Sequence, residues 1–410
     1  MYTSGSTGNP KGVLVRDKAI VNTLLSMQFL FPMEKGDAFL FKTNTVFDVS
    51  LTEILGWFFG LGKVIVLPIN YELDPAALLE QININKITHI NFVPSMLCAL
   101  CNYIEVTGKK VKSNLKYIFV AGEAFNVALA HRTKKIFKNA CIVNAYGPTE
   151  AAVYTTYYIF NGNEKFLPIG KPLPNMTVYV LDKRMFPVPI GVKGELYISG
   201  IGLAEGYINN EVISQKAFIK NKIFGNKLAY KTGDVVKLNE DENVEYIGRQ
   251  DSQIKIRGYR IELGEIESKI KEISCIQNCA VLVIEDNNQE YLVAYLVSKD
   301  PNLSLEFMLN EVKTTLENSL PSYMIPRDYV KLDELPINSS GKLDRKSLKD
   351  SFDPSQFKSK VHEEISFTEK KLLNAWKKCL GRGNIDVNKS FFDLGGTSLK
   401  VIELYFGKGL

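Results

Sequence analysis

Residues 115–123, LKYIFVAGE, form a short apolar run that ends in small and polar residues. Two runs of the same kind, ITHINFVPS at 87–95 and ACIVNAYG at 140–147, lie on either side, with segments of helical length between them. Short apolar runs that alternate with helical segments are typical of parallel strands joined by crossover helices. We therefore predict an α/β fold. Ligands bind at the carboxyl ends of the strands in open α/β sheets, so one shared site is expected there. The residues expected to face it are Asn91, Ala121 and Ala145.

The amino-acid composition limits the classes of protein to which this chain can belong. A chain of 410 residues with 45% hydrophobic content predicts two to three domains with buried cores. The net charge of +5 is spread along the sequence, which argues against a nucleic-acid partner. No apolar stretch reaches the ~18 residues that span a bilayer, and the polar start is unlike a signal peptide, so no membrane partner is expected. The cysteines lie mostly inside apolar runs and, with three isolated histidines, predict no metal-ligand cluster. We therefore expect a cytoplasmic location.

A second block begins near residue 250, where QIKIRGYRIE (253–262) alternates as a strand does. The next segment places Ile266, Ile270 and Ile273 on one helical face. Two more strand-like runs and a helix from about 304 to 318 complete a compact α+β unit.

The C-terminal part of the chain predicts a linker and a small helical module. Residues 349–364 are polar and charged, as a linker is. Beyond them, a capping box from Ser366 to Glu369 precedes apolar residues at helical spacing. The predicted organisation is a large domain (1–250), a small domain (251–348), a linker (349–364) and the helical module (365–410).

The stretch YTSGSTGNPKG, residues 2–12, has the composition of a loop that binds phosphate. Glycines let a backbone approach an anion closely, and successive N–H groups in such a loop form a concave anion site. The loop is not a Walker P-loop, because Lys11 follows Pro10 and precedes Gly12 instead of preceding a hydroxyl residue. A flexible Ser/Gly-rich linker remains the alternative for this stretch taken alone.

Eight further motifs follow this loop along the chain. They are FDVS (47–50), NAYGPTE (144–150), GELYISGIGLAEGY (194–207), YKTGD (230–234), GRQDSQIKIRGYRIE (248–262), LPSYMIP (320–326), NSSGKLDR (338–345) and FFDLGGTSL (391–399). In this order they resemble the motifs of adenylation domains of nonribosomal peptide synthetases, followed by their peptidyl carrier domain. The resemblance implies an α/β adenylate-forming large domain with βα layers, a small α+β C-terminal lobe and a helical carrier bundle.

The resemblance implies that the chain binds ATP with magnesium. The glycine-rich loop would close over the β- and γ-phosphates, Thr149 would touch the α-phosphate, and Glu150 would help to hold Mg²⁺, which prefers oxygen ligands. Tyr146 would stack on the adenine, while Asp234 and Arg249 would fix the ribose hydroxyls. For each residue alone, a turn or surface position is the alternative. The loop residues concerned are Thr3, Ser4, Gly5, Ser6, Thr7, Gly8 and Lys11.

Lys342 in NSSGKLDR matches the catalytic lysine of the family, whose ammonium bridges the substrate carboxylate and the α-phosphate. The alternative is one exposed lysine among many. Because Lys342 lies in the second block and Tyr146 in the first, the resemblance implies domain movement. The hinge would be Asp251, and Gly258 would let the pantetheine arm pass. A plain turn glycine is the alternative for Gly258.

Asp48 in FDVS matches the carboxylate that pairs with the α-ammonium of an amino-acid substrate. A buried charge of this kind makes sense when the ligand supplies its partner. A cap for a helix that begins at SLTEIL is the alternative. The matching pocket positions carry no charge, so the resemblance favours an amino acid with a neutral side chain. These positions are Val49, Thr52, Asn91, Phe119, Ala121, Ala145, Val153 and Tyr154.

Ser398 in FFDLGGTSL matches the serine that carries 4'-phosphopantetheine, whose thiol captures the aminoacyl group as a thioester. A plain helix N-cap is the alternative. The partners implied are the amino acid, other synthetase modules and a phosphopantetheinyl transferase. In the family more sequence precedes the phosphate loop and follows Ser398, so we expect an N-terminally truncated large domain with exposed apolar surface and unpaired edges, and a partial carrier. An inactive fragment and an acyl-CoA ligase remain the competing functions.

Overall fold

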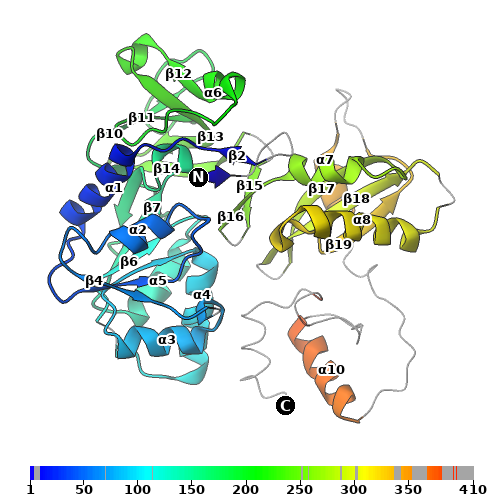
Figure 1. Cartoon of the computed structure of the whole chain (residues 1–410), viewed down its shortest axis with the longest axis horizontal. Helices are drawn as coiled ribbons and strands as arrows, with labels where there is room; N and C mark the ends of the chain where they lie inside the picture. Colours follow the sequence, from blue (N-terminus) through cyan, green and yellow to red (C-terminus); the bar gives the residue numbers. More distant parts are fainter. Residues whose placement is uncertain are drawn as a thin grey trace. The chain divides into compact units, whose positions relative to one another are not determined.

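The computed structural model describes residues 1–3, 10–69, 71–112, 114–250, 253–256, 258–286, 289–300, 303–336, 343–352, 367–380, 391 and 394. The chain divides into two compact units (Figure 1). The first comprises Met1–Thr3 and Pro10–Gly258, and the chain enters the second at Tyr259.

A seven-stranded sheet forms the centre of the first unit, in the order β4-β3-β5-β6-β7-β8-β9. The strands from β4 to β7 are parallel, whereas β8 and β9 are antiparallel to their neighbours. The three apolar runs become β5, β6 and β7, so the predicted parallel strands are confirmed. The bounds are β3 Ala38–Phe41, β4 Lys63–Val66, β5 His89–Phe92, β6 Tyr117–Val120, β7 Cys141–Tyr146, β8 Thr156–Ile159 and β9 Lys171–Pro172.

Helices connect these strands, and local chemistry sets several of their ends. The side chains of Asp74 and Asn126 cap α3 and α5 by accepting from backbone N–H groups, and Pro94 opens α4. Helix α4 packs against both α3 and α5. The bounds are α1 Asp17–Leu30, α2 Ser50–Leu55, η1 Tyr71–Leu73, α3 Pro75–Ile84, α4 Pro94–Thr107, α5 Val127–Ile136 and η2 Thr149–Ala151.

The first unit also contains a five-stranded antiparallel sheet that the sequence did not predict. Its order is β10-β11-β13-β12, and β14 pairs with β13. The bounds are β10 Met176–Leu181, β11 Gly194–Gly200, α6 Glu211–Ala217, β12 Phe218–Lys220, η3 Lys222–Phe224, β13 Leu228–Leu238 and β14 Val244–Arg249. The short strands β1 Tyr2–Thr3, β2 Lys11–Gly12 and β15 Gln253–Ile256 complete the unit.

The second unit is the predicted α+β block. Its sheet has the order β17-β18-β19, with an antiparallel pair followed by a parallel one. The three isoleucines expected on one helical face, Ile266, Ile270 and Ile273, are all buried. The bounds are β16 Tyr259–Glu262, α7 Leu263–Lys271, β17 Ile276–Asp286, β18 Gln289–Ser298, α8 Leu305–Ser319, η4 Ser322–Met324, β19 Asp328–Leu332 and α9 Arg345–Asp350.

The predicted C-terminal helix is α10, Phe367–Leu380. Leu373 and Leu380 on this helix cluster with Phe391 and Leu394. The capping residue Ser366 lies outside the described residues. None of the described helices is long and apolar enough to cross a bilayer.

Apolar side chains are exposed along one face of α1, where Val21, Leu25 and Phe29 are spaced four residues apart. Phe29 is 79% exposed. Residues four apart lie on one helical face, so the three form a continuous stripe. The large domain thus exposes an apolar stripe on α1.

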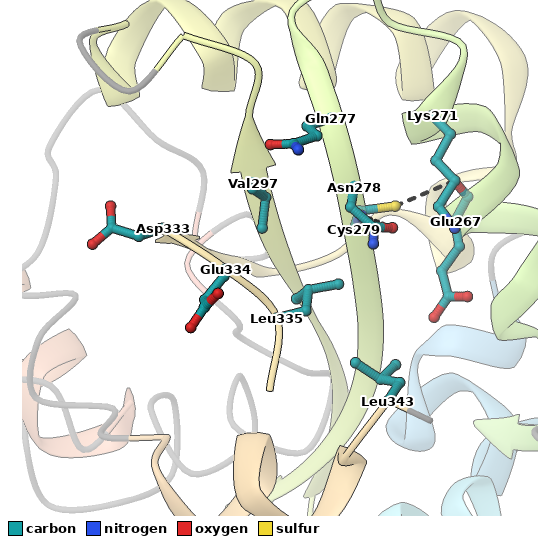
Figure 2. Close-up of a pocket in the computed structure, with 10 residues that line it drawn as sticks. All are labelled: Glu267, Lys271, Gln277, Asn278, Cys279, Val297, Asp333, Glu334, Leu335 and Leu343. Atoms are coloured by element: carbon teal, nitrogen blue, oxygen red, sulfur yellow. Dashed lines mark hydrogen bonds between the residues drawn. The ribbon is translucent and has the colours of Figure 1, made fainter. Parts of the chain in front are cut away.

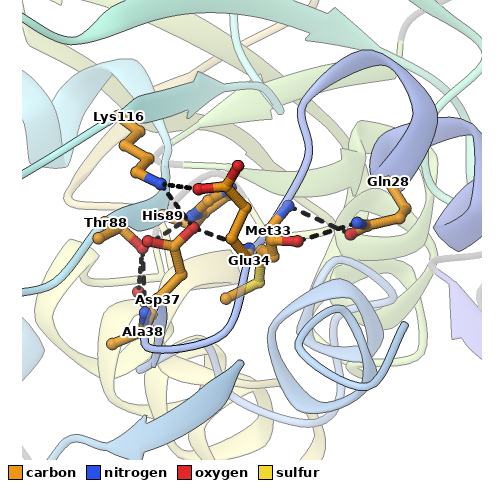
Figure 3. Close-up of polar contacts among 8 residues, drawn as sticks. All are labelled: Gln28, Met33, Glu34, Asp37, Ala38, Thr88, His89 and Lys116. Carbon is orange, nitrogen blue, oxygen red and sulfur yellow. Dashed lines mark hydrogen bonds and ion pairs between the residues drawn. The ribbon is translucent and has the colours of Figure 1, made fainter. Parts of the chain in front are cut away.

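A polar cluster lies at the amino ends of β3, β5 and β6 (Figure 3). Lys116 pairs with Asp37 at 2.9 Å and with Glu34 at 3.0 Å, and Thr88 Oγ1 lies 2.9 Å from Nδ1 of His89. His89 is 1% exposed, and burial lowers its pKa to about 4. The imidazole is therefore neutral at pH 7.

Candidate active site

Three residues predicted to bind adenine and ribose meet between the two sheets of the first unit. Tyr146 ends β7, and its hydroxyl donates to Oδ2 of Asp234 on β13. Arg249, the partner of Asp234 in the β13–β14 ladder, donates from Nη1 to Oδ1 of Asp234 at 2.8 Å. Burial and the charge of Asp234 raise the pKa of Tyr146 well above its ordinary value. The phenol therefore remains a donor toward the carboxylate.

Glu150 lies in η2, directly after Thr149, and its side chain is fully buried. Its Oε1 accepts a hydrogen bond of 2.7 Å from the hydroxyl of Tyr207. Thr149 is half-buried. The predicted metal ligand is therefore a buried carboxylate with an oriented oxygen, which matches the oxygen preference of magnesium.

The two ends of the predicted phosphate loop lie side by side. Thr3 on β1 pairs with Lys11 on β2 in an antiparallel ladder. Thr3 Oγ1 is buried without a hydrogen-bond partner in the described part of the chain. Lys11 Nζ lies 5.6 Å from the centre of the Tyr207 ring. The ladder thus closes a loop whose central residues lie outside the described ranges, namely Ser4, Gly5, Ser6, Thr7 and Gly8.

The predicted amino-acid site lies at the carboxyl ends of β5, β6 and β7. Asn91 on β5 is in register with Phe119 on β6, which is in register with Val143 on β7. Side chains alternate along a strand, so residues two positions further on point to the same face. Asn91, Phe119, Ala121 and Ala145 therefore share one face of the sheet, as expected for a single site.

Asn91 and Tyr154 are in direct contact in this site. The Tyr154 hydroxyl donates to Asn91 Oδ1 at 3.3 Å, and Asn91 Nδ2 donates to Thr52 Oγ1 at 2.9 Å. Burial and the charges of Glu53 and Asp48 raise the pKa of Tyr154. The phenol is therefore neutral and lies within electrostatic reach of both carboxylates.

Asp48 is half-buried and lies two residues before α2. The N-cap of this helix is Val49, so Asp48 does not occupy the cap position considered as its alternative role. Val153 is buried and, like Ala152 before it, has a positive φ, of 75° and 56° respectively. Two consecutive residues with a Cβ rarely both have a positive φ. This conformation is most strained for a β-branched residue such as valine.

The sequence did not single out Glu53, although this residue contacts several residues in and around the predicted amino-acid site. Its fully buried carboxylate accepts from the backbone N–H groups of Lys42 and Thr43, from the Thr43 hydroxyl at 2.8 Å, and from Asn91 Nδ2 at 3.3 Å. Lys42 Nζ lies 3.9 Å from Oε1, and burial lowers the pKa of this lysine. The available signal was a charged residue directly before the apolar run ILGWFFG.

Gly258 has a φ of 80° and lies against Val93, which follows β5. A Cβ at this position would be 2.7 Å from Val93 Cγ1. The glycine is therefore required both for its conformation and for its close contact. Three predicted residues, Lys342, Asp251 and Ser398, lie outside the described residues.

The second unit contains a cavity of about 460 Å³ (Figure 2). Its lining includes Cys279, whose Sγ donates to the backbone oxygen of Glu267 at 3.3 Å. Burial raises the pKa of Cys279 to about 12. Cys98 and Cys101 on α4 are spaced as in a CxxC motif, but burial raises the pKa of Cys101 to about 11. The thiols of Cys101 and Cys279 are therefore poor nucleophiles at neutral pH.

Two family models match the chain. Residues 1–208 match the AMP-binding enzyme family, and residues 265–342 match the AMP-binding enzyme C-terminal domain. Together they cover most of the predicted large and small domains.

Curated relatives and solved structures agree with these matches. The chain is 40% identical to the polyketide synthase PksN of Bacillus subtilis and 37% identical to a linear gramicidin synthase protein of Brevibacillus parabrevis. Both matches cover 98% of this chain. It spans only 7% and 8% of these relatives. It also resembles holo-PA1221, a nonribosomal peptide synthetase protein with adenylation and carrier domains, with a TM-score of 0.79 and 26% identity over 100% of this chain and 68% of that one. The chain therefore belongs to the AMP-binding enzyme family and is similar to proteins of nonribosomal peptide synthesis.

Proposed function

We propose that this protein activates an α-amino acid with ATP, releasing pyrophosphate and forming an aminoacyl-AMP, as part of a larger peptide synthetase. One observation carries the proposal. The end of β7 supplies both Ala145, on the face of the amino-acid site, and Tyr146, which contacts Asp234. A nucleotide held by Tyr146 and Asp234 would therefore lie next to an amino acid held on the face that carries Ala145.

The nucleotide would be held mainly by groups that are already oriented. A carboxylate has about four acceptor positions, so Asp234 retains capacity for ribose hydroxyls beside its bonds to Tyr146 and Arg249. The adenine would stack on Tyr146, Thr149 would contact the α-phosphate, and the loop from Thr3 to Lys11 would enclose the outer phosphates. The buried hydroxyl of Thr3 supports this role, because it lacks a partner in the described protein.

The donor chemistry of the site fits magnesium. Glu150 would hold the cation, which neutralises phosphate charge when bound. Lys342 would direct its ammonium group at the charge that builds on the α-phosphate and the substrate carboxylate. Because little covalent chemistry falls to the protein, positioning and charge neutralisation would provide most of the catalysis.

Asp48 would pair with the α-ammonium of the substrate. The predicted pocket residues Asn91, Thr52 and Tyr154 are neutral, and the buried carboxylate of Glu53 beside them faces Lys42, which supports an amino acid with a neutral side chain. An acyl-CoA ligase acting on a fatty or aryl acid would have no ammonium group to pair with Asp48.

The aminoacyl group would then pass to phosphopantetheine on Ser398, supplied by a phosphopantetheinyl transferase, and on to other synthetase modules. Asp251 would be the hinge of the domain movement, and Gly258, which lies against Val93 in this structure, would let the pantetheine arm pass because it has no side chain. No disulfide joins the cysteines in the described part of the chain, which supports a reducing, cytoplasmic location. We propose a large domain at residues 1–250, a small domain at 251–348, a linker at 349–364 and a helical carrier module at 365–410.

Exchange of labelled pyrophosphate into ATP, tested with each of the twenty amino acids, examines the proposed activation step. We expect exchange with one or a few neutral amino acids. Absence of exchange with all of them would favour an inactive fragment, and exchange with fatty or aryl acids would favour a ligase. Mass spectrometry after incubation with CoA and a phosphopantetheinyl transferase tests Ser398, with Ser398→Ala as the control.

A further inference from the structure

We propose that Tyr207 is a positioning residue that connects the phosphate-loop lysine, Lys11, to the metal-binding carboxylate of Glu150. The inference rests on the proposed function, because it takes the roles of these two residues from it. Tyr207 ends the motif GELYISGIGLAEGY, and the resemblance assigned no role to this tyrosine.

The backbone around Tyr207 is joined to the chain that leaves the phosphate loop. Tyr207 forms an antiparallel β-bridge with Val13. Ile208 N donates to Gly12 O at 2.7 Å, and Leu14 N donates to Gly206 O at 3.0 Å. A displacement of the loop exit is therefore transmitted directly to the backbone that carries the Tyr207 ring.

The side chain of Tyr207 contacts both functional groups. Its hydroxyl donates to Glu150 Oε1 at 2.7 Å, and its ring lies 5.6 Å from Lys11 Nζ, within cation–π range. The ring also packs edge-on against Phe218 at 5.8 Å and is only 7% exposed. Tyr207 thus has a fixed ring that contacts the lysine with its π-system and the carboxylate with its hydroxyl.

The hydroxyl matters because it orients a metal ligand. Partners that hydrogen-bond to a ligating carboxylate fix its orientation, and their loss typically lowers metal affinity roughly 10- to 100-fold. Tyr207 is therefore expected to prepare Glu150 for the metal–nucleotide complex, while its backbone keeps the loop exit in register with the same group.

Tyr207→Phe tests this role in the full chain, since it keeps the ring and removes only the hydroxyl. We expect the dissociation constant of Mn²⁺ in the presence of ATP, measured by electron paramagnetic resonance of unbound Mn²⁺, to rise roughly 10- to 100-fold. The Mg²⁺ concentration that gives half-maximal pyrophosphate exchange should rise in parallel. The KM for the amino acid should not change, because Asn91 and Tyr154 are untouched.

Tyr197→Phe is the matched control. Tyr197 is buried in the same unit, and its hydroxyl donates to the Glu195 carboxylate at 3.2 Å, so this variant also removes a Tyr–Glu hydrogen bond. Mn²⁺ binding by Tyr197→Phe should equal that of the wild type. Urea denaturation of both variants separates loss of stability from loss of metal affinity.

Tyr207→Leu removes the ring as well, and should raise the KM for ATP beyond the value for Tyr207→Phe. The inference is overturned if Tyr207→Phe binds Mn²⁺ as the wild type does, or loses no more affinity than Tyr197→Phe. A wild-type protein that binds no Mn²⁺ with ATP would overturn the proposed function itself. The two failures are therefore distinguishable.

Discussion

Replacement of Glu53 by alanine is expected to destabilise the first unit by about 3–5 kcal/mol, the usual cost of removing one partner from a buried ion pair. Glu53 is fully buried, and Lys42, which faces it at 3.9 Å, has a side chain that is 3% exposed. The substitution would leave the ammonium group and two backbone N–H groups without this acceptor. Glu53→Gln keeps one acceptor oxygen and should cost less, about 1.5–3 kcal/mol, the range for hydrogen bonds to charged groups.

Tryptophan fluorescence during urea denaturation measures these changes. The chain has two tryptophans, so a Trp376→Phe background leaves Trp57 as the only reporter. Trp57 Nε1 donates to Ile54 O at 2.6 Å, one residue after Glu53, and therefore reports on this part of the unit.

Glu34→Ala provides the control, because Glu34 also pairs with a lysine, Lys116, but is 72% exposed. Exposed pairs contribute about 0–1 kcal/mol. If Glu53→Ala changes the free energy of unfolding no more than Glu34→Ala does, the reasoning about the buried pair is refuted.

Three further predictions concern catalysis, pH and the close contact at Gly258. Lys342→Ala should lower the rate of adenylate formation by the equivalent of ~2.7–4 kcal/mol without changing the unfolding midpoint; wild-type pyrophosphate exchange would contradict its assignment. The pKa of His89 is lowered from 6.5 to about 4, so between these values the unfolded state binds a proton that the folded state does not. The contribution of His89 to stability should therefore be complete above pH 6.5 and fall by up to about 3 kcal/mol toward pH 4. The stability of His89→Phe should fall less than that of the wild type over this range, and an equal fall would contradict the reasoning. Gly258→Ala should impair thioester formation more than adenylation, and adding Val93→Ala should restore only the part due to the 2.7 Å contact, because the positive φ persists; full recovery would show that φ is unimportant.

Sequence patterns predicted the elements that have local signals. The runs that became β5, β6 and β7 are mostly apolar, and the isoleucines Ile266 and Ile270 of α7 recur at helical spacing, so hydrophobicity and periodicity identified these elements. The antiparallel sheet was missed because β13 interrupts its alternation with YKTGD, a string that was interpreted only as a motif.

Contacts between distant residues had no such signal. Tyr207 and Glu150 are 57 positions apart, and Asn91 and Glu53 are 38 apart. The motifs that contain Tyr207 and Glu150 were found, but their hydrogen bond depends on how β2 and the segment before α6 pack against each other. Glu53 was missed because its role comes from tertiary burial, which a single sequence does not encode locally.

Ala152 and Val153 have a left-handed backbone conformation. For this reason the positions of the proposed amino-acid site would not all tolerate mutation equally in laboratory evolution. A residue strained in this way costs about 1–3 kcal/mol of conformational free energy. Only glycine would remove this strain without a change of the backbone conformation. Val153→Gly would therefore widen the site while recovering part of the stability lost with the buried valine side chain. Libraries that seek a new substrate preference should include glycine at position 153, because the release of backbone strain there offsets part of the cost of removing the buried side chain.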